Sequence, residues 1–517
     1  MKTVRITALF SLALVLGFLG CHAYGAGGPG AGLKKRVKAD RERNIVLPHT
    51  DGHWQRTKDY VEEEPDSDYV HASVKAHEAF RDIKFAVRVH WGIYSLWQMD
   101  GESWGFLDLP DEKKAEYNQL YRTFNPQGFD ADEWMSLFSR AGIKAVAFTT
   151  KHHEGFSMFD TGTKVVRRVN YLDPEHPIEE CCLDYDIMET PYGKDVLKEI
   201  CDAAHRYKMK IDLYFSHPDW YDADFRPYNY HPLTTPDMVN NIGNYGYGYE
   251  NARQVIMSPD RTPEETERMV ARHREQLREL LTNYGRIDML CLDQWLGKDV
   301  WPQTKETVKM IRKLHPDIMI RARGIGNYGD YYTPEGFVPG DKENTDMPWM
   351  VIYPLGKSFS YDKDGTNYKG AGWMVHNIID CAAKGGSFMV GIGPDGNGEF
   401  HPEAVRQLEQ VGDWMRVNGS GIYSTRAREV WKSGDVYFTA SKNGKDVFAF
   451  VEAWPGKELF IPSVEPKKGS RIFMLGYDEP LDWTMTEAGL KVSIHEELND
   501  EDKRPCGYAW GFRIKVK

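Results

Sequence analysis

Two segments of the chain end in carboxylates whose placement suits chemistry better than packing. The first is a mostly apolar run over residues 287–292, too short for a typical helix and followed at once by Asp293. A buried strand has no structural need for an ionised aspartate at its end, because taking that charge out of water costs free energy. The second is the loop-like stretch 329–335, which delivers Glu335. Two carboxylates that converge from separate elements are what cleavage of a glycosidic bond requires.

Both carboxylates also have a plain structural interpretation. Asp293 could cap a helix or lie on the surface after the strand. Thr333-Pro334-Glu335 also fits an ordinary loop or helix start. Asp288 begins the same strand as Asp293 at its opposite end, and we expect it to be structural.

Other polar side chains interrupt apolar runs at the points where predicted strands end. They are His90, the run Lys151-His152-His153-Glu154, Tyr214 with His217, and Arg321 with Arg323. In a parallel barrel the carboxyl ends of all strands meet at one face, where active sites are built. Together with Asp293 they make five interruptions at equivalent strand ends, which predict one shared site.

Helical stripes alternate with short β-rich runs between residues 76 and 427. The predicted strands cover residues 85–94, 144–150, 211–215, 287–292, 318–322 and 388–392. Such alternation indicates βα units and a parallel sheet. It favours an α/β fold of the (β/α)8-like TIM barrel type over a doubly wound sheet. No GxGxxG follows the first strand, which argues against a dinucleotide fold.

The pattern changes near residue 428. Two β-rich runs, 436–440 and 447–451, flank Asn443-Gly444, which is a strong hairpin signal. We therefore expect residues 428–517 to form a small antiparallel β-sandwich.

The start of the chain is typical of an exported protein. Lys2 and Arg5 precede an apolar stretch, 8–19, that is too short to span a bilayer comfortably. We interpret residues 1–25 as a signal peptide and 26–75 as a linker and irregular N-terminal segment. Leu19-Gly20-Cys21 resembles a bacterial lipobox, which would place a lipid anchor on Cys21. The expected location is periplasmic, cell-surface as a lipoprotein, or secreted.

Composition and net charge narrow the classes of possible binding partner. The 517 residues carry a net charge of −12, which disfavours nucleic acid and anionic membrane surfaces as partners. No later stretch is long and apolar enough to predict a transmembrane helix. Aromatic residues make up 13% of the chain, and a sugar-binding cleft would use several of them.

A metal site is a weaker interpretation of the polar strand ends. His152 and His153 could be ligands, but no HExxH or comparable spacing accompanies them. Neighbouring strand residues point to opposite faces, so the pair reaches one site only if the strand ends or bulges there. Hydrogen bonding to sugar hydroxyls is the favoured role of this histidine pair, and a purely structural role in the core is the alternative.

Asp395-Gly396-Asn397-Gly398-Glu399 lacks the full calcium-loop pattern and predicts a tight turn. Adjacent Cys181-Cys182 has no CxxC spacing. We predict no metal and no cofactor.

Residues from about 80 to 425 resemble the α-L-fucosidases of glycoside hydrolase family 29. The matching segments are His90-Trp91-Gly92-Ile93-Tyr94, Phe124-Asn125-Pro126, 129–142, 151–156, 213–216, 284–288, Asp293, 330–335, 393–398 and Val417-Asn418-Gly419. They occur in the family's order and cover most of the predicted barrel.

The resemblance implies an exo-acting retaining enzyme that removes terminal α-L-fucose from an oligosaccharide or glycoconjugate. By this resemblance, Asp293 is the nucleophile and Glu335, 42 residues later, is the acid/base. Carboxylates of a retaining pair lie roughly 5–5.5 Å apart. The positions that bind the sugar match His90, His152, His153, Tyr214 and Arg323, and the family's Glu-Trp pair corresponds to Glu102 and Trp104.

Three departures from the family pattern fall near the predicted site. Cys291 stands where a Trp is usual, Ser103 interrupts the Glu-Trp pair, and Glu154 replaces the Asp of His-His-Asp. Loss of an indole would enlarge the pocket, so an α-L-glycosidase of altered specificity, such as an α-L-galactosidase, is one alternative. A non-catalytic carbohydrate-binding barrel is the other.

Overall fold

The computed structural model describes residues 43–168, 178–180, 184–225, 261–340 and 345–517. The predicted signal peptide with Cys21, the first part of the predicted linker and the Cys181-Cys182 pair lie outside these residues.

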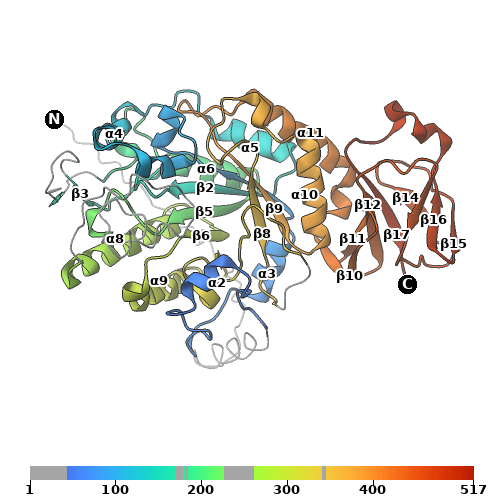
Figure 1. The fold of residues 1–517 in the computed structure, drawn as a ribbon, viewed down its shortest axis with the longest axis horizontal. Coiled ribbons are helices and arrows are strands. Elements are labelled where there is room, and N and C mark those ends of the chain that lie inside the picture. Colours follow the sequence, from blue (N-terminus) through green and yellow to red (C-terminus); the bar gives the residue numbers. More distant parts are fainter. Residues whose placement is uncertain (1–42, 169–177, 181–183, 226–260, 341–344) are drawn as a thin grey trace, which may run out of the picture.

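Parallel strands form a curled sheet at the centre of the larger domain (Figure 1). Within the described residues the sheet has seven strands in the order β7-β6-β5-β2-β1-β9-β8. They are β1 (Phe85–Val89), β2 (Ala145–Lys151), β5 (Lys210–Ser216), β6 (Met289–Asp293), β7 (Met319–Ile320), β8 (Met350–Pro354) and β9 (Ser387–Ile392). The prediction located six of them, and β8 is the additional one.

An irregular segment completes the ring between the two edge strands. Residues 331–335 form isolated parallel bridges to both sides: Tyr331 pairs with Arg321 after β7, and Glu335 pairs with Ile352 of β8. Pro334 has no N–H to give to a ladder, so a regular strand cannot form here. The predicted barrel is thus present as seven strands plus this segment, which was expected to be a loop.

Helices pack around the sheet and are fixed at their starts by capping side chains. Asp130 caps α5, Asp195 caps α6, and Thr262 forms a capping box with Glu265 at α8. The helices are α2 (Gly52–Thr57), α3 (Val74–Arg81), α4 (Asp111–Tyr117), α5 (Ala131–Arg140), α6 (Val196–Arg206), α8 (Pro263–Thr282), α9 (Trp301–Leu314), α10 (Ala371–Ala383) and α11 (Pro402–Asn418). No helix in the described parts of the chain is long and apolar enough to cross a membrane.

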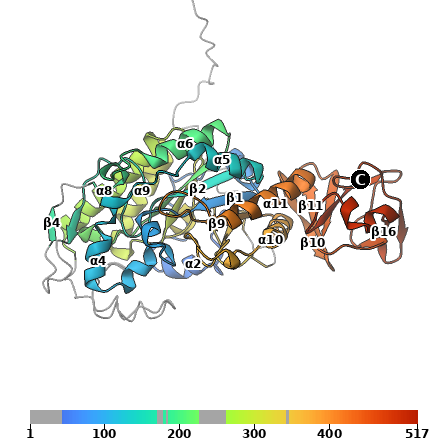
Figure 2. The same cartoon turned by 90° about the horizontal axis from the view of Figure 1, so that it is seen from above.

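Two antiparallel sheets form the C-terminal domain, as predicted. One has the order β10-β11-β12-β17-β14 and the other β13-β16-β15. Their bounds are β10 (Thr425–Ser433), β11 (Val436–Ser441), β12 (Asp446–Val451), β13 (Glu458–Ile461), β14 (Ile472–Met474), β15 (Trp483–Thr486), β16 (Gly489–Ser493) and β17 (Trp510–Lys515). Phe438 and Phe512 of one sheet share a buried core with Ile461 and Leu490 of the other. The domain lies beside α10 and α11, away from the rest of the barrel (Figures 1 and 2). A separate short ribbon, β3 (Val166–Arg168) with β4 (Ile178–Glu180), lies within the barrel domain.

The described part of the N-terminal segment contacts the barrel. From residue 43 it carries α2 and packs on the loop that follows β7. The Leu47 N–H donates to Asn327 Oδ1 at 2.8 Å, and the Tyr69 hydroxyl donates to the Tyr328 carbonyl at 2.5 Å. This segment therefore belongs structurally to the barrel domain.

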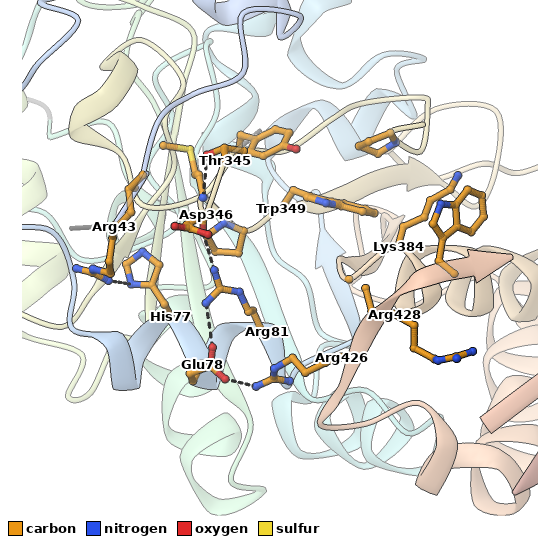
Figure 3. Close-up of a pocket in the computed structure, with 18 of the residues that line it drawn as sticks. Arg43, His77, Glu78, Arg81, Thr345, Asp346, Trp349, Lys384, Arg426 and Arg428 are labelled. Carbon is orange, nitrogen blue, oxygen red and sulfur yellow. Dashed lines mark hydrogen bonds and ion pairs between the residues drawn. The ribbon is translucent and has the colours of Figure 1, made fainter. Parts of the chain in front are cut away.

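A cavity of about 770 Å³ lies where the barrel meets the C-terminal domain (Figure 3). Its wall includes Trp349 and Lys384, which precede β8 and β9 and so mark the amino ends of the strands. Glu78 pairs there with Arg81 and Arg426. The predicted catalytic residues follow the carboxyl ends of the strands, so this cavity is not their pocket.

Candidate active site

The structure brings the predicted residues to one end of the barrel. Asp293 is the last residue of β6, Tyr214 lies near the end of β5, and His90 follows β1. The pairing between β2 and β5 shifts register between Thr149 and Lys151. That irregularity at the strand end allows His152 and His153 to reach one site, as the prediction required.

Asp293 is surrounded by donors. Its Oδ1 accepts hydrogen bonds from Arg323 Nη1 at 2.7 Å and from Arg321 Nη1 at 3.4 Å. Its Oδ2 accepts a hydrogen bond from the Tyr214 hydroxyl at 2.6 Å, and His153 Nε2 lies 3.7 Å away. Burial alone would raise the pKa of Asp293, but Arg323, His153 and Arg321 hold it well below its usual value. The carboxylate is therefore ionised at neutral pH.

Glu335 shares an arginine with Asp293. Arg323 Nη2 donates to Glu335 Oε2 at 2.8 Å, while Nη1 of the same side chain binds Asp293. The two carboxylates are thus separated by a single planar guanidinium. The Glu335 side chain is 44% exposed, against 8% for Asp293, so the glutamate faces the open side of the site.

Aromatic and imidazole rings form the wall around the two carboxylates. His152 stacks on Tyr214 with centroids 5.6 Å apart, and Trp104 meets His153 at 4.8 Å. His90 stacks on Phe359 at 4.8 Å. Burial lowers the pKa values of His90 and His152 well below the usual range, so both rings are neutral. A neutral imidazole has one donor and one acceptor, which suits a sugar hydroxyl.

Phe359 and Trp220 are site residues that the sequence analysis missed. Trp220 stacks on His153 with centroids 5.1 Å apart. It follows Tyr214 and His217 closely in the chain, so its place after β5 was a usable signal. Phe359 lies in a segment without periodicity after β8, where no sequence signal pointed to the site.

Several polar atoms at this end of the barrel are buried without a hydrogen-bond partner among the described residues. They include His90 Nδ1, Glu102 Oε1, both ring nitrogens of His153, and Glu154 Oε2. Unpaired buried polar groups are costly, so a cluster of them points to a ligand rich in hydroxyls. In the described parts of the chain, no three His, Cys, Asp or Glu side chains are grouped to hold a metal ion.

Glu102 reaches the site from the 3-10 helix Glu102–Asp108. Burial raises its pKa to about 8, against the opposing effect of hydrogen bonds from the backbone of Phe359 and Ser360. The carboxyl is therefore mostly protonated at neutral pH and has a proton to donate.

Cys291 has a different neighbourhood from the expected one. The thiol is fully buried in β6, and Sγ accepts hydrogen bonds from Arg321 at 2.9 Å and Arg88 at 3.2 Å. Guanidinium groups therefore fill the space beside it.

Family comparisons agree with this geometry. The profile of the alpha-L-fucosidase family matches residues 54–420, and that of the alpha-L-fucosidase C-terminal domain matches residues 431–515. The chain belongs to the alpha-L-fucosidase family. It is therefore a glycoside hydrolase.

Relatives that carry the name alpha-L-fucosidase are distant in sequence, and the similarity covers most of both chains. Human plasma alpha-L-fucosidase is 24% identical over 470 residues, covering 84% of this chain and 89% of the relative. The alpha-L-fucosidase of Dictyostelium discoideum is 22% identical over 419 residues, covering 74% and 79%.

Solved alpha-L-fucosidase structures share the fold. Isoenzyme 1 from Paenibacillus thiaminolyticus has 24% identity and a TM-score of 0.68, covering 86% of this chain and all of the other. A Bacteroides thetaiotaomicron enzyme, solved as a covalent intermediate trapped with 2-fluoro-fucosyl fluoride, has 22% identity and a TM-score of 0.67, covering 86% and 97%.

Proposed function

We propose that the chain is an exo-acting, retaining α-L-fucosidase in which Asp293 is the nucleophile and Glu335 the acid/base. The observation that carries this assignment is the single guanidinium of Arg323, which hydrogen-bonds both carboxylates. An inverting pair is held about 6.5–9.5 Å apart to admit a water, whereas a retaining pair is closer. A shared arginine supports the closer arrangement.

In the first step the ionised Asp293 attacks the anomeric carbon of the fucosyl residue. The bond from that carbon to the leaving oxygen breaks as Glu335 gives its proton to the oxygen. In the second step Glu335 takes a proton from water, and the water oxygen displaces Asp293 from the anomeric carbon. Two inversions give retention, and both carboxyl groups return to their starting states.

Neighbouring groups prepare Asp293 for attack. Arg323 and Arg321 keep it ionised, and Tyr214 orients one oxygen through a short hydrogen bond. His90, His152, His153 and Glu102 supply donors and acceptors for sugar hydroxyls, and Trp104 supplies an apolar face. These groups belong to the chain itself, so the proposed reaction uses no cofactor.

The substrate is a fucosylated oligosaccharide or glycoconjugate. We further propose that the enzyme is exported, on the support of the basic and apolar segment at residues 2–19. One form of this proposal places a lipid anchor on Cys21. Cys21→Ser tests it, because the change should release a membrane-held enzyme into the soluble fraction.

The function is tested with nitrophenyl α-L-fucoside and α-L-galactoside, followed by NMR of the sugar as it is released. We expect preference for the fucoside and initial release of the α anomer. Preference for the galactoside would favour the alternative specificity, and initial release of the β anomer would exclude the retaining mechanism. Binding without turnover of either glycoside would favour the non-catalytic barrel.

A further inference from the structure

Ser103 interrupts the Glu-Trp pair of the family, and the backbone directly before it adopts an unusual conformation. Glu102 has φ +58°, directly after Gly101 at φ +82°. A non-glycine residue in the left-handed region is uncommon and carries a conformational cost. Such outliers gather at functional sites, where the surrounding structure compensates for them.

The conformation places the Ser103 hydroxyl against an imidazole of the site. Ser103 is fully buried, and its Oγ lies 2.5 Å from Nδ1 of His152. His152 stacks on Tyr214, whose hydroxyl donates to Asp293. The other ring nitrogen of His152, Nε2, has no hydrogen-bond partner among the described residues and is available to a sugar.

A second departure from the family pattern meets the same nitrogen. Glu154, which replaces an aspartate, is buried and has its Oε2 3.8 Å from His152 Nδ1. Burial raises the pKa of Glu154 to about 8, and hydrogen bonds from its own backbone and from Ser103 act in the opposite direction. The carboxyl is therefore mostly protonated at neutral pH. Two independent changes in sequence thus converge on one side of one imidazole.

We propose that Ser103 is a positioning residue that, backed by Glu154, fixes the tautomer and orientation of His152 toward the sugar. The serine hydroxyl donates to His152 Nδ1, and the Glu154 carboxyl lies beside the same nitrogen. The neutral imidazole then carries its proton on Nε2, which donates to a sugar hydroxyl. The sugar in this inference rests on the proposed function, whereas the tautomer of His152 that Ser103 sets does not.

A double-mutant cycle separates positioning from packing. Ser103→Ala is expected to lower kcat/KM for the nitrophenyl fucoside about tenfold, the value of one lost hydrogen bond. In the His152→Gln background the same change should have no further effect, because its target is gone. An equal loss in both backgrounds, or no loss in either, would overturn the proposal.

Ser95→Ala is the matched control. Ser95 lies in the neighbouring 3-10 helix Ile93–Trp97, is 2% exposed, and its Oγ is buried without a partner among the described residues. Its removal should leave kcat/KM within about twofold of the wild type. A loss equal to that of Ser103→Ala would show that any buried hydroxyl here matters only for packing, which would also overturn the proposal.

Nitrogen-15 NMR of histidine-labelled enzyme gives a readout that needs neither turnover nor a folded Ser103 variant. The His152 signal is identified by its loss in His152→Gln. We expect the Nε2–H tautomer in the wild-type protein, and an Nδ1–H tautomer would overturn the inference. Failure of the wild type to hydrolyse any fucoside would instead count against the proposed function, and the NMR result would stand.

Discussion

Asp330 and Asp293 are both buried beside arginine in this barrel, but their surroundings differ. Asp330 is fully buried, and its oxygens accept from the Ala72 and Ile320 N–H groups and from Arg312, with His71 close by. Every direction around that carboxylate is occupied by the protein. Asp293 also binds arginine, but it lies at the strand ends among unpartnered polar atoms. A carboxylate whose hydrogen-bond partners all come from the protein indicates a structural ion pair. A carboxylate among unpartnered polar atoms indicates a site that binds a ligand.

Asp293→Asn should cause the largest loss of activity. The amide cannot form the ester with the sugar, so kcat should fall by at least about 10⁴-fold while ligand binding persists. Steady-state kinetics with the nitrophenyl fucoside and calorimetric binding of an L-fuco iminocyclitol would measure the two effects. A loss below tenfold would remove Asp293 from its assigned role.

Glu335→Gln should come next. Loss of a general acid costs about 10²- to 10⁴-fold in rate, and the loss should shrink for a dinitrophenyl leaving group that needs no proton. Comparing nitrophenyl and dinitrophenyl fucosides would show this pattern. An equal loss for both substrates would assign protonation to another residue.

Asp330→Asn should damage stability instead of chemistry. Breaking a buried ion pair costs about 3–5 kcal/mol, because Arg312 loses its partner. Chemical denaturation should show this loss, whereas kcat of the folded fraction should stay within about twofold of the wild type. Since Arg312 and His71 hold the pKa of Asp330 below its usual value despite burial, the difference should shrink as pH falls through the acid range. A variant that remains stable but inactive would break the distinction between the two aspartates.

Glu102→Gln should give the smallest effect. Its effect on stability should depend on pH in the opposite direction from that of Asp330→Asn. Burial raises the pKa of Glu102 from 4.5 to about 8, so the folded protein keeps a proton that the unfolded chain releases between those values. Its contribution to stability is therefore complete at low pH and is lost as pH rises through that window. The variant should gain about 2–4 °C in Tm relative to wild type at pH 8.5 and little at pH 5. An unchanged difference across this range would contradict the assignment.

The sequence located the elements with strong apolar periodicity. The strands that position His90, Tyr214 and Asp293 are mostly apolar runs with polar residues at or near their ends, so both strand and site residue were predictable. The segment 331–335 was expected to be a loop. Its pairing consists of isolated bridges instead of a regular ladder, so it carries no strand pattern that the sequence could reveal.

Contacts that depend on the detailed backbone conformation could not be predicted from the sequence. The approach of Ser103 to His152 requires the left-handed conformation of Glu102, which no propensity favours. Likewise, the guanidinium groups around Cys291 come from β1 and from the residue after β7, so only the folded barrel places them there.

Trapping with 2-fluoro-fucosyl fluoride, followed by peptide mapping, tests the central assignment most directly. The fluorine slows hydrolysis of the ester, so the glycosyl-enzyme accumulates and its attachment point can be sequenced. We predict one label per chain, on Asp293. A label on any other residue, or rapid turnover of an active enzyme without a covalent adduct, would contradict the account.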